Sequence, residues 1–169
     1  MADIDEFIGR LNPDMCVVTA TAGGERAGCL VGFASQCSIR PVRFVVWLSE
    51  VNHTFRVARA AEFLAVHLLE REQRALAELF GGHTGDQEDK FGQVRWWEGH
   101  GGAVVLHDAP AWFIGRIVTR VDGGDHVGFV LDPVAHGGHG AREAHEGPLL
   151  RLDDARTISP GHPVDPPSG

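Results

Sequence analysis

The chain has 169 residues, of which 43% are hydrophobic, so we expect one globular domain that is large enough for a sizeable core. Its formal net charge is −8 and it has no basic cluster, which argues against nucleic acid and anionic membranes as partners. Because no apolar stretch is long enough to span a membrane and the N-terminus lacks the basic-then-apolar pattern of a signal peptide, we expect a cytoplasmic protein.

The N-terminal part of the chain predicts two helices and four strands. Apolar residues at helical spacing predict a helix over residues 3–11, with one face made by Ile4, Phe7, Ile8 and Leu11. Residues 15–21 are rich in β-branched side chains and end at Gly23-Gly24, which predicts a hairpin into a strand that begins near Glu25. We expect, further along, a turn at 38–41, a strand over 43–49 that is covered on both faces, a helix over about 53–61 and a strand over 63–69.

The rest of the chain is less regular. Residues 70–80 have helical periodicity, whereas the pattern breaks down over 81–102, where we expect a helical turn at 87–91 and an irregular segment anchored by Trp96-Trp97. A long strand over 112–121, a hairpin turn at Asp122-Gly123-Gly124-Asp125 and a return strand over 126–134 follow. Residues 136–147 read as a Gly- and His-rich loop, and residues 148–152 as a short final strand.

About six strands, two or three helices and several hairpins, without strict β-α-β alternation, predict a mainly antiparallel barrel. We expect one domain over residues 1–158 and a flexible Pro/Gly-rich tail over 159–169. No GxGxxG motif follows a strand, so a Rossmann dinucleotide site is not expected.

One stretch, residues 27–54, combines features of a cofactor site. Its first part mixes apolar residues with small and polar ones, and small side chains let a flat ligand approach the backbone. An apolar strand follows, and then Asn52 or Thr54 suits a helix N-cap, where free N–H groups favour an anion. A planar polar ring beside a phosphate describes flavin mononucleotide (FMN). The alternative is an ordinary barrel strand followed by a capped helix.

This stretch contains, in order, Gly28, Phe33, Ser35, Cys37, Pro41 and Asn52-His53-Thr54. Further elements follow at residues 63–69, 73–80, 89–91 and 124–126. Together they resemble the signature of the flavin reductase-like family of FMN-binding split barrels, which reads Gly-x-Thr-x-(Asn/Ser)-Ser-Phe-x-Ser-x-Ser-x-x-Pro-Pro and then Asn-x-Thr/Ser. The resemblance covers residues 10–152 and implies a mainly β fold with flanking helices, a single-domain FMN-binding split β-barrel of the Greek-key antiparallel kind.

The resemblance also implies which residues hold the cofactor. The ring of FMN would be lined by Leu30, Val31, Gly32, Phe33, Ser35, Gln36, Cys37 and Ser38. The phosphate would lie at Asn52 and Thr54, with Arg56 or Arg59 supplying charge, and Lys90 and Phe91 would lie near the dimer-related site. Plain helix capping at Asn52 and a solvated charge pair beside a core phenylalanine at residues 89–91 are the alternatives. Leu30, Val31, Gly32 and Cys37 depart from the family pattern, so either backbone groups make the ring contacts or the pocket is altered.

His126 is the candidate catalytic residue. The resemblance places the histidine of a Gly-Asp-His motif near the flavin, where it can position the nicotinamide amide or support negative charge on the reduced ring; histidine side chains titrate near neutral pH. The hydride chemistry itself belongs to the flavin. The alternative is a surface histidine that closes a hairpin.

Neither a disulfide nor a metal site is expected. Cys16, Cys29 and Cys37 show no CxxC spacing and are odd in number, which indicates free thiols. His136, His139 and His145 could in principle bind a metal, but a Gly-rich loop without a cysteine ligand is a poor zinc site.

The sequence thus predicts a homodimeric flavin reductase that passes hydride from NAD(P)H to FMN, with FAD or the deazaflavin F420 as less favoured cofactors. The homodimer is expected because Trp96, Trp97 and Trp112 need cover, and reduced flavin could be supplied to a partner monooxygenase. Three alternatives remain open at this point: a deazaflavin (F420)-dependent reductase, a non-enzymatic FMN-binding electron-transfer module, and a structural barrel with a degenerate site.

Overall fold

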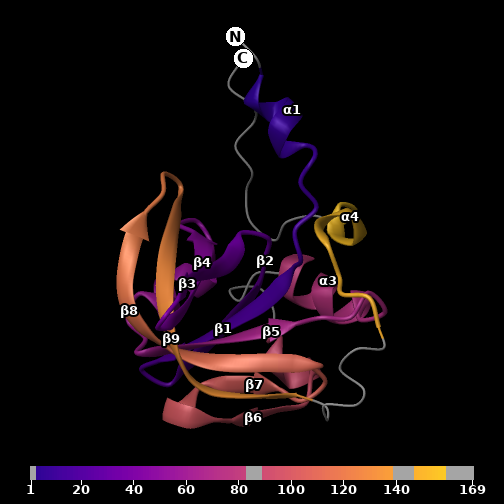
Figure 1. Ribbon diagram of the computed structural model, residues 1–169. Coiled ribbons are helices and arrows are strands. Elements are labelled where there is room, and N and C mark those ends of the chain that lie inside the picture. The colour runs from indigo at the N-terminus through magenta and orange to yellow at the C-terminus, as the bar shows by residue number, and fades with distance from the viewer. Residues whose placement is uncertain (1–2, 83–88, 139–146, 159–169) are drawn as a thin grey trace.

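A computed structural model describes residues 3–82, 89–138 and 147–158 (Figure 1). The helices are α1 (Ile4–Ile8), α2 (His53–Ala58), α3 (Arg74–Gly82) and α4 (Leu152–Ala155), with short 3-10 helices at Phe91–Gln93 and His100–Gly102. The strands are β1 (Cys16–Ala22), β2 (Glu25–Val31), β3 (Ala34–Ile39), β4 (Val42–Ser49), β5 (Phe63–Leu68), β6 (Trp96–Glu98), β7 (Val104–Leu106), β8 (Ala111–Asp122) and β9 (His126–Gly138). In the described part of the chain, no helix is long and apolar enough to cross a membrane.

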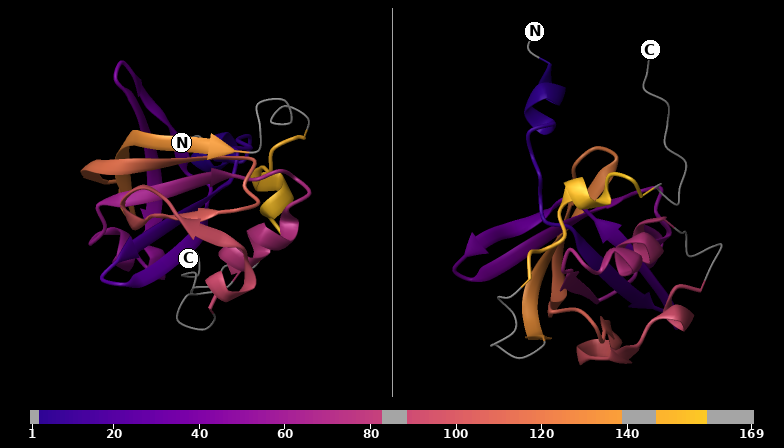
Figure 2. Two further views of the ribbon diagram at one scale, coloured as in Figure 1. Left: turned by 90° about the horizontal axis from the view of Figure 1, so that it is seen from below. Right: turned by 90° about the vertical axis from the view of Figure 1, so that its right-hand side faces the viewer.

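Seven of the strands form one antiparallel sheet in the order β2-β1-β5-β8-β9-β4-β3, and β6 and β7 form a separate pair. The edge strands β2 and β3 are joined along the chain by only Gly32 and Phe33. Because consecutive Cα atoms lie 3.8 Å apart, the facing ends of the two edges are within roughly 11 Å of each other. The sheet therefore curls into a barrel that is split between β2 and β3 (Figure 2), which confirms the expected mainly β split barrel with flanking helices.

Strand β1 runs through the middle of the core and is buried on both faces. Alternate residues of a strand point to opposite sides, so Val18 joins the cluster inside the barrel, with Leu64 and Phe129, while Val17 joins a second cluster. The second cluster lies between β1 and the helices α3 and α4, and includes Phe80. Strand β1 thus contributes side chains to both hydrophobic clusters.

The hairpin turns follow the expected chemistry. Gly23 and Gly24, between β1 and β2, have φ angles of 58° and 79°. Two successive residues with positive φ are typical of the tight turns that match the twist of antiparallel strands, and glycine adopts them without strain. The sequence prediction of a hairpin at this position is confirmed.

Several predicted boundaries are wrong. Residues 148–152 are not a strand, because successive backbone groups bond to different neighbours: the Leu150 N–H donates to Leu69 O, and Leu150 O accepts from Met15 N–H. The chain then enters α4. The helix expected over 70–80 begins only at Arg74, since Glu70 forms an isolated bridge with Leu149.

The segment expected to be irregular, residues 81–102, contains β6, whose partner β7 was not predicted. Strand β9 continues to Gly138, so residues 136–138 are strand rather than loop. Gly137 lies opposite Trp112, and a Cβ atom there would be 2.6 Å from the indole ring, so glycine is needed for the packing. Residues 87–88, the remainder of the predicted loop (139–146) and the predicted tail (159–169) lie outside the described residues.

Candidate functional site

A cavity of about 250 Å³ lies where the barrel is split. Six of its lining residues were predicted from the sequence: Leu30, Val31, Gly32, Phe33, Asn52 and His126. Six were not predicted: Met15, Cys29, Trp47, Leu48, Ser49 and Leu152. The cavity therefore combines the connection between the two edge strands with the end of β4 and the start of β9.

A second cavity of about 280 Å³ is lined by Phe33, Trp47, Gly123, Asp125 and His126. Three of these residues, Phe33, Trp47 and His126, also line the first cavity. The two cavities thus share one wall. Two ligands, or two parts of one ligand, can lie against the same aromatic and imidazole rings.

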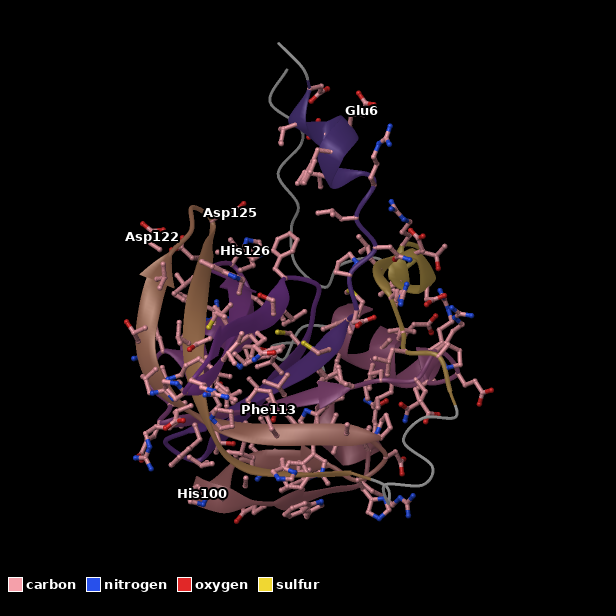
Figure 3. All side chains as sticks on the ribbon, viewed as in Figure 1. Glu6, His100, Phe113, Asp122, Asp125 and His126 are labelled. Carbon is pink, nitrogen blue, oxygen red and sulfur yellow. The ribbon has the colours of Figure 1, made fainter. Side chains whose placement is uncertain are left out.

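His126 is held in place by its neighbours at the β8–β9 turn (Figure 3). It is the first residue of β9 and pairs with Ser49 of β4. Its Nδ1 lies 2.7 Å from Oδ1 of Asp125, and this hydrogen bond, together with the charge of the imidazole, lowers the pKa of the Asp125 carboxyl. Nε2 of the ring makes no hydrogen bond within the described part of the chain, which leaves this nitrogen for a ligand.

Trp47 forms the wall that both cavities share. It lies on β4 opposite Gly128 of β9. A Cβ atom at Gly128 would be 2.9 Å from the indole ring, and one at Gly123 would be 2.6 Å from it. The two glycines of the β8–β9 hairpin therefore make room for the tryptophan. The backbone N–H of Trp47 donates to the backbone carbonyl oxygen of Phe33 at 2.9 Å, and this bond fixes the connection between the edge strands.

The start of α2 contributes Asn52 to the first cavity. Its side-chain Oδ1 accepts a hydrogen bond from the Thr54 N–H at 2.9 Å, so Asn52 is the N-cap and the predicted capping is confirmed. Thr54 is only 1% exposed, and its hydroxyl bonds the thiol of Cys29. Burial raises the pKa of Cys29 to about 11, and the Thr54 hydroxyl partly opposes this rise. A direct contact between Thr54 and a cofactor stays a prediction.

The other predicted site residues do not line either cavity: Ser35, Gln36, Cys37, Ser38, Lys90 and Phe91. The first four lie on the edge strand β3, and Cys37 sits at a bulge where the pairing with β4 shifts register. Of the three cysteines, Cys16 and Cys29 are buried and Cys37 is exposed. The exposed one is the cysteine that the resemblance places in the cofactor loop.

Lys90 and Phe91 are buried beside α3. Nζ of Lys90 donates to the carbonyl oxygens of Gly28, at 3.0 Å, and Phe80, at 3.2 Å. Phe91 packs edge-on against the ring of Phe80, with ring centroids 5.8 Å apart. The pair thus connects β2, which lines the first cavity, to α3. A role of Lys90 near a dimer-related cofactor stays a prediction.

The metal prediction concerns three histidines. His136 lies on β9, whereas His139 and His145 lie outside the described residues. Within residues 3–82, 89–138 and 147–158, no group of three metal-ligating side chains comes together.

The residues missed from the sequence fall into two kinds. Trp47 stands inside a predicted buried strand. The sequence signals that could have indicated its role are its size and the glycines of the later predicted hairpin, which leave room for a large ring. Met15 and Leu152 lie far apart in the chain and meet at the cavity only because residues 149–151 bridge the segments just before β1 and just after β5. No local pattern indicates such a meeting.

Residues 8–157 match the Flavin reductase like domain family. The chain belongs to this family. The predicted resemblance is confirmed over nearly the whole chain.

Individual relatives and a solved structure are consistent with this family assignment. The FMN reductase (NADH) RutF of Agrobacterium fabrum is 30% identical over 124 residues, which cover 73% of this chain and 71% of RutF. Diflavin flavoprotein A 1 of Synechocystis sp. is 23% identical over 126 residues, and the chain spans only 22% of the length of that protein. The crystal structure of a flavin reductase domain protein from Arthrobacter sp. FB24 superposes with a TM-score of 0.77 at 19% identity and covers 98% of both chains, which establishes the shared fold.

Proposed function

We propose that this chain is a flavin reductase that passes a hydride from NAD(P)H to FMN. The observation that carries the proposal is that His126 and Phe33 line two adjoining cavities at the split of a flavin reductase-like barrel. One cavity suits the flavin and the other the nicotinamide. The relative RutF, of which the chain covers 71%, is an FMN reductase that uses NADH, and this supports the reaction and both ligand classes.

The lining of the first cavity suits a flat, mostly apolar ligand that carries a few polar groups at its edge. Leu30 and Leu152 supply apolar walls, and Ser49 and Asn52 supply polar groups. A Cβ atom at Gly32 would lie 3.2 Å from the sulfur of Met15, so a glycine at this position leaves room for the Met15 side chain in the cavity wall. This composition is that of a small-molecule site. When FMN is bound, its ring accepts the hydride, and the protein holds and orients it.

The phosphate of FMN would lie at the start of α2. Asn52 lines the cavity and caps this helix. The positive end of the helix dipole and the first backbone N–H groups favour an anion there. Arg56 is exposed on the same helix and adds positive charge. Thr54 would act mainly by connecting the start of α2 to β2, through the hydrogen bond between its hydroxyl and Cys29.

His126 would be the catalytic residue. Asp125 accepts the Nδ1–H of the imidazole and holds the ring in the second cavity. Nε2 would then position the nicotinamide amide or support the negative charge that develops on the reduced flavin. The shared wall of Phe33 and Trp47 would keep the two ring systems in contact.

The functional unit would be a homodimer that delivers reduced flavin to a monooxygenase. Within one chain, Trp96 is covered by the guanidinium of Arg26, 4.5 Å from its ring centroid. Trp97 packs edge-on against Trp112 but remains 42% exposed, so it is the tryptophan that a second copy would cover. Lys90 and Phe91 would support the cofactor site from their position beside α3.

The proposal is tested by the oxidation of NADH and NADPH by the purified protein with added FMN, riboflavin or F420. We expect turnover with FMN. Turnover with F420 alone would favour the deazaflavin reductase, binding of FMN without turnover would favour an electron-transfer module, and a colourless protein that binds no flavin would favour a structural barrel.

A further inference from the structure

The N-terminal helix α1 has an apolar face that nothing in the described part of the chain covers. Ile4, Phe7 and Ile8 are 65%, 62% and 52% exposed, and Leu11 in the turn that follows is 46% exposed. No residue of α1 is buried, and the helix stands away from the barrel (Figure 1). Isolated helices shorter than about 12 residues are marginal in water. The helix therefore needs a surface to pack against.

A second exposed apolar patch lies at the tip of the β3–β4 hairpin. Ile39 and Val42 are directly opposite each other in the ladder and are 76% and 52% exposed. Directly paired side chains of an antiparallel sheet lie on the same face, so the two form one patch. The hairpin and α1 leave the barrel in different directions (Figure 2), so neither covers the other within one chain.

The two patches are complementary in charge. The apolar face of α1 is flanked by Asp3, Asp5 and Glu6, of which Glu6 pairs with Arg10 at 3.3 Å. The apolar patch of the hairpin is flanked by the exposed Arg40. The acidic helix would be repelled by an anionic lipid surface, which attracts amphipathic helices rich in lysine and arginine. In contrast, the positive charge of Arg40 at the hairpin tip would attract the acidic helix.

We propose that α1 of one copy packs on Ile39 and Val42 of a second copy. In a two-fold dimer the contact occurs twice, because each copy offers both a helix and a hairpin. The acidic residues of α1 then lie near Arg40 of the hairpin, and six exposed apolar residues per copy become covered, four of the helix and its following turn and two of the hairpin. The inference rests on the proposed homodimer and adds which surfaces form it.

The first test measures dimer dissociation by analytical ultracentrifugation. The double variant Phe7→Ser/Ile8→Ser changes only exposed side chains, so it should fold normally, and we expect its dimer dissociation constant to rise at least tenfold. Val118→Ser/Val121→Ser is the matched control, because it removes two aliphatic side chains that are 45% and 42% exposed outside both patches. Its dissociation constant should not change.

The outcomes separate this inference from the proposed homodimer. A wild-type protein that sediments only at its monomer mass of 18.3 kDa overturns both. A dimer that the α1 substitutions leave unchanged, or that both pairs of substitutions weaken equally, overturns the helix exchange alone.

The second test uses the exposed Cys37, which lies on β3 two residues from Ile39. With Ile8→Cys, a short bismaleimide should join the introduced thiol of one copy to Cys37 of the other and give a product of doubled mass. Wild type and Ile8→Cys/Cys37→Ser are the controls, and neither should give this product. Equal amounts of product from Ile8→Cys and from either control would overturn the helix exchange.

Discussion

The imidazole of His126 and the phenyl ring of Phe33 lie 5.0 Å apart, centroid to centroid, at an interplanar angle of 52°. The two residues come from different parts of the barrel: Phe33 from the connection between the edge strands, and His126 from the start of β9. Both line both cavities. A ligand in either cavity therefore contacts the same pair of rings, and this pair is where two ligands can meet.

Replacing His126 tests whether this contact serves the reaction. We expect His126→Ala to slow the reduction of bound FMN by NADH about tenfold, equivalent to about 1.4 kcal/mol of transition-state stabilisation. FMN binding should change little. If the imidazole takes part in proton transfer or charge stabilisation, the pH profile of the wild-type rate should differ from that of the variant rate. Stopped-flow reduction at several pH values measures both.

If His126 only closes the hairpin, the two proteins will show equal rates and equal pH profiles. Asp125→Asn is the matched control for the orientation of the ring, since the amide can still accept the hydrogen bond from Nδ1. We expect it to lose less activity than His126→Ala.

A charge placed at Asn52 tests the phosphate site. Asn52→Asp keeps a good N-cap for α2, so the free energy of unfolding should hardly change. The added carboxylate should repel the phosphate and weaken FMN far more than riboflavin, which has no phosphate. Fluorescence titration of both ligands measures this, with Asn52→Ser as the uncharged control that also caps the helix. An equal loss of affinity for both ligands would place the phosphate elsewhere.

The packing of Trp47 against the β8–β9 hairpin should control the shape of both cavities. Gly128→Ala puts a methyl group 2.9 Å from the indole ring, which must move toward the cavities. Overpacking of this kind costs about 1–3 kcal/mol of stability, and we expect flavin affinity to fall at least tenfold. Adding Trp47→Phe relieves the contact, so the double variant should bind flavin more tightly than Gly128→Ala alone. A single variant that binds flavin normally would show that Trp47 does not shape the site.

His67 should make the stability of the fold depend on pH. Its side chain is fully buried, Nε2 accepts a hydrogen bond from the Leu106 N–H at 3.0 Å, and Nδ1 therefore donates to Val17 O at 2.9 Å. Both nitrogens of the neutral ring therefore have a hydrogen-bond partner. Burial lowers its pKa from 6.5 to about 4, although the bond to Val17 partly opposes this.

Below pH 6.5 the unfolded chain binds a proton on His67 that the folded chain excludes. The free energy of unfolding should therefore fall as the pH drops from about 6.5 to about 4, by about 3 kcal/mol from this residue. His67→Gln can keep both hydrogen bonds without titrating. Urea unfolding at pH 7 and pH 4.5 should show a smaller loss for the variant than for wild type, and equal losses would assign the acid sensitivity to other groups.

The strands and hairpins were predictable because their signals are local. Gly23-Gly24 and the Asp122–Asp125 turn mark hairpins by residue type, and β-branched runs mark the strands between them. Residues 148–152 were mistaken for a strand because an apolar run reads the same whether it forms a ladder or single bridges to two neighbours.

The candidate site was predictable only where it coincides with the family signature. Phe33, Asn52 and His126 match the signature and line the first cavity, while their contact with a cofactor stays a prediction. Ser35 lies outside it, because the chain enters the edge strand β3 at Ala34. Which residues face a cavity depends on how the sheet curls, and that is decided by long-range pairing rather than by local sequence.

The central claim is that a nicotinamide hydride reaches flavin held at the split of the barrel. The most direct measurement is anaerobic stopped-flow reduction of FMN by NADH, with and without the protein, using NADH that carries deuterium at C4. We predict that the protein accelerates bleaching of the flavin absorption band and that the deuterium slows the bleaching, because the transferred C–H bond breaks in that step. Bleaching no faster than that of free FMN would contradict the claim.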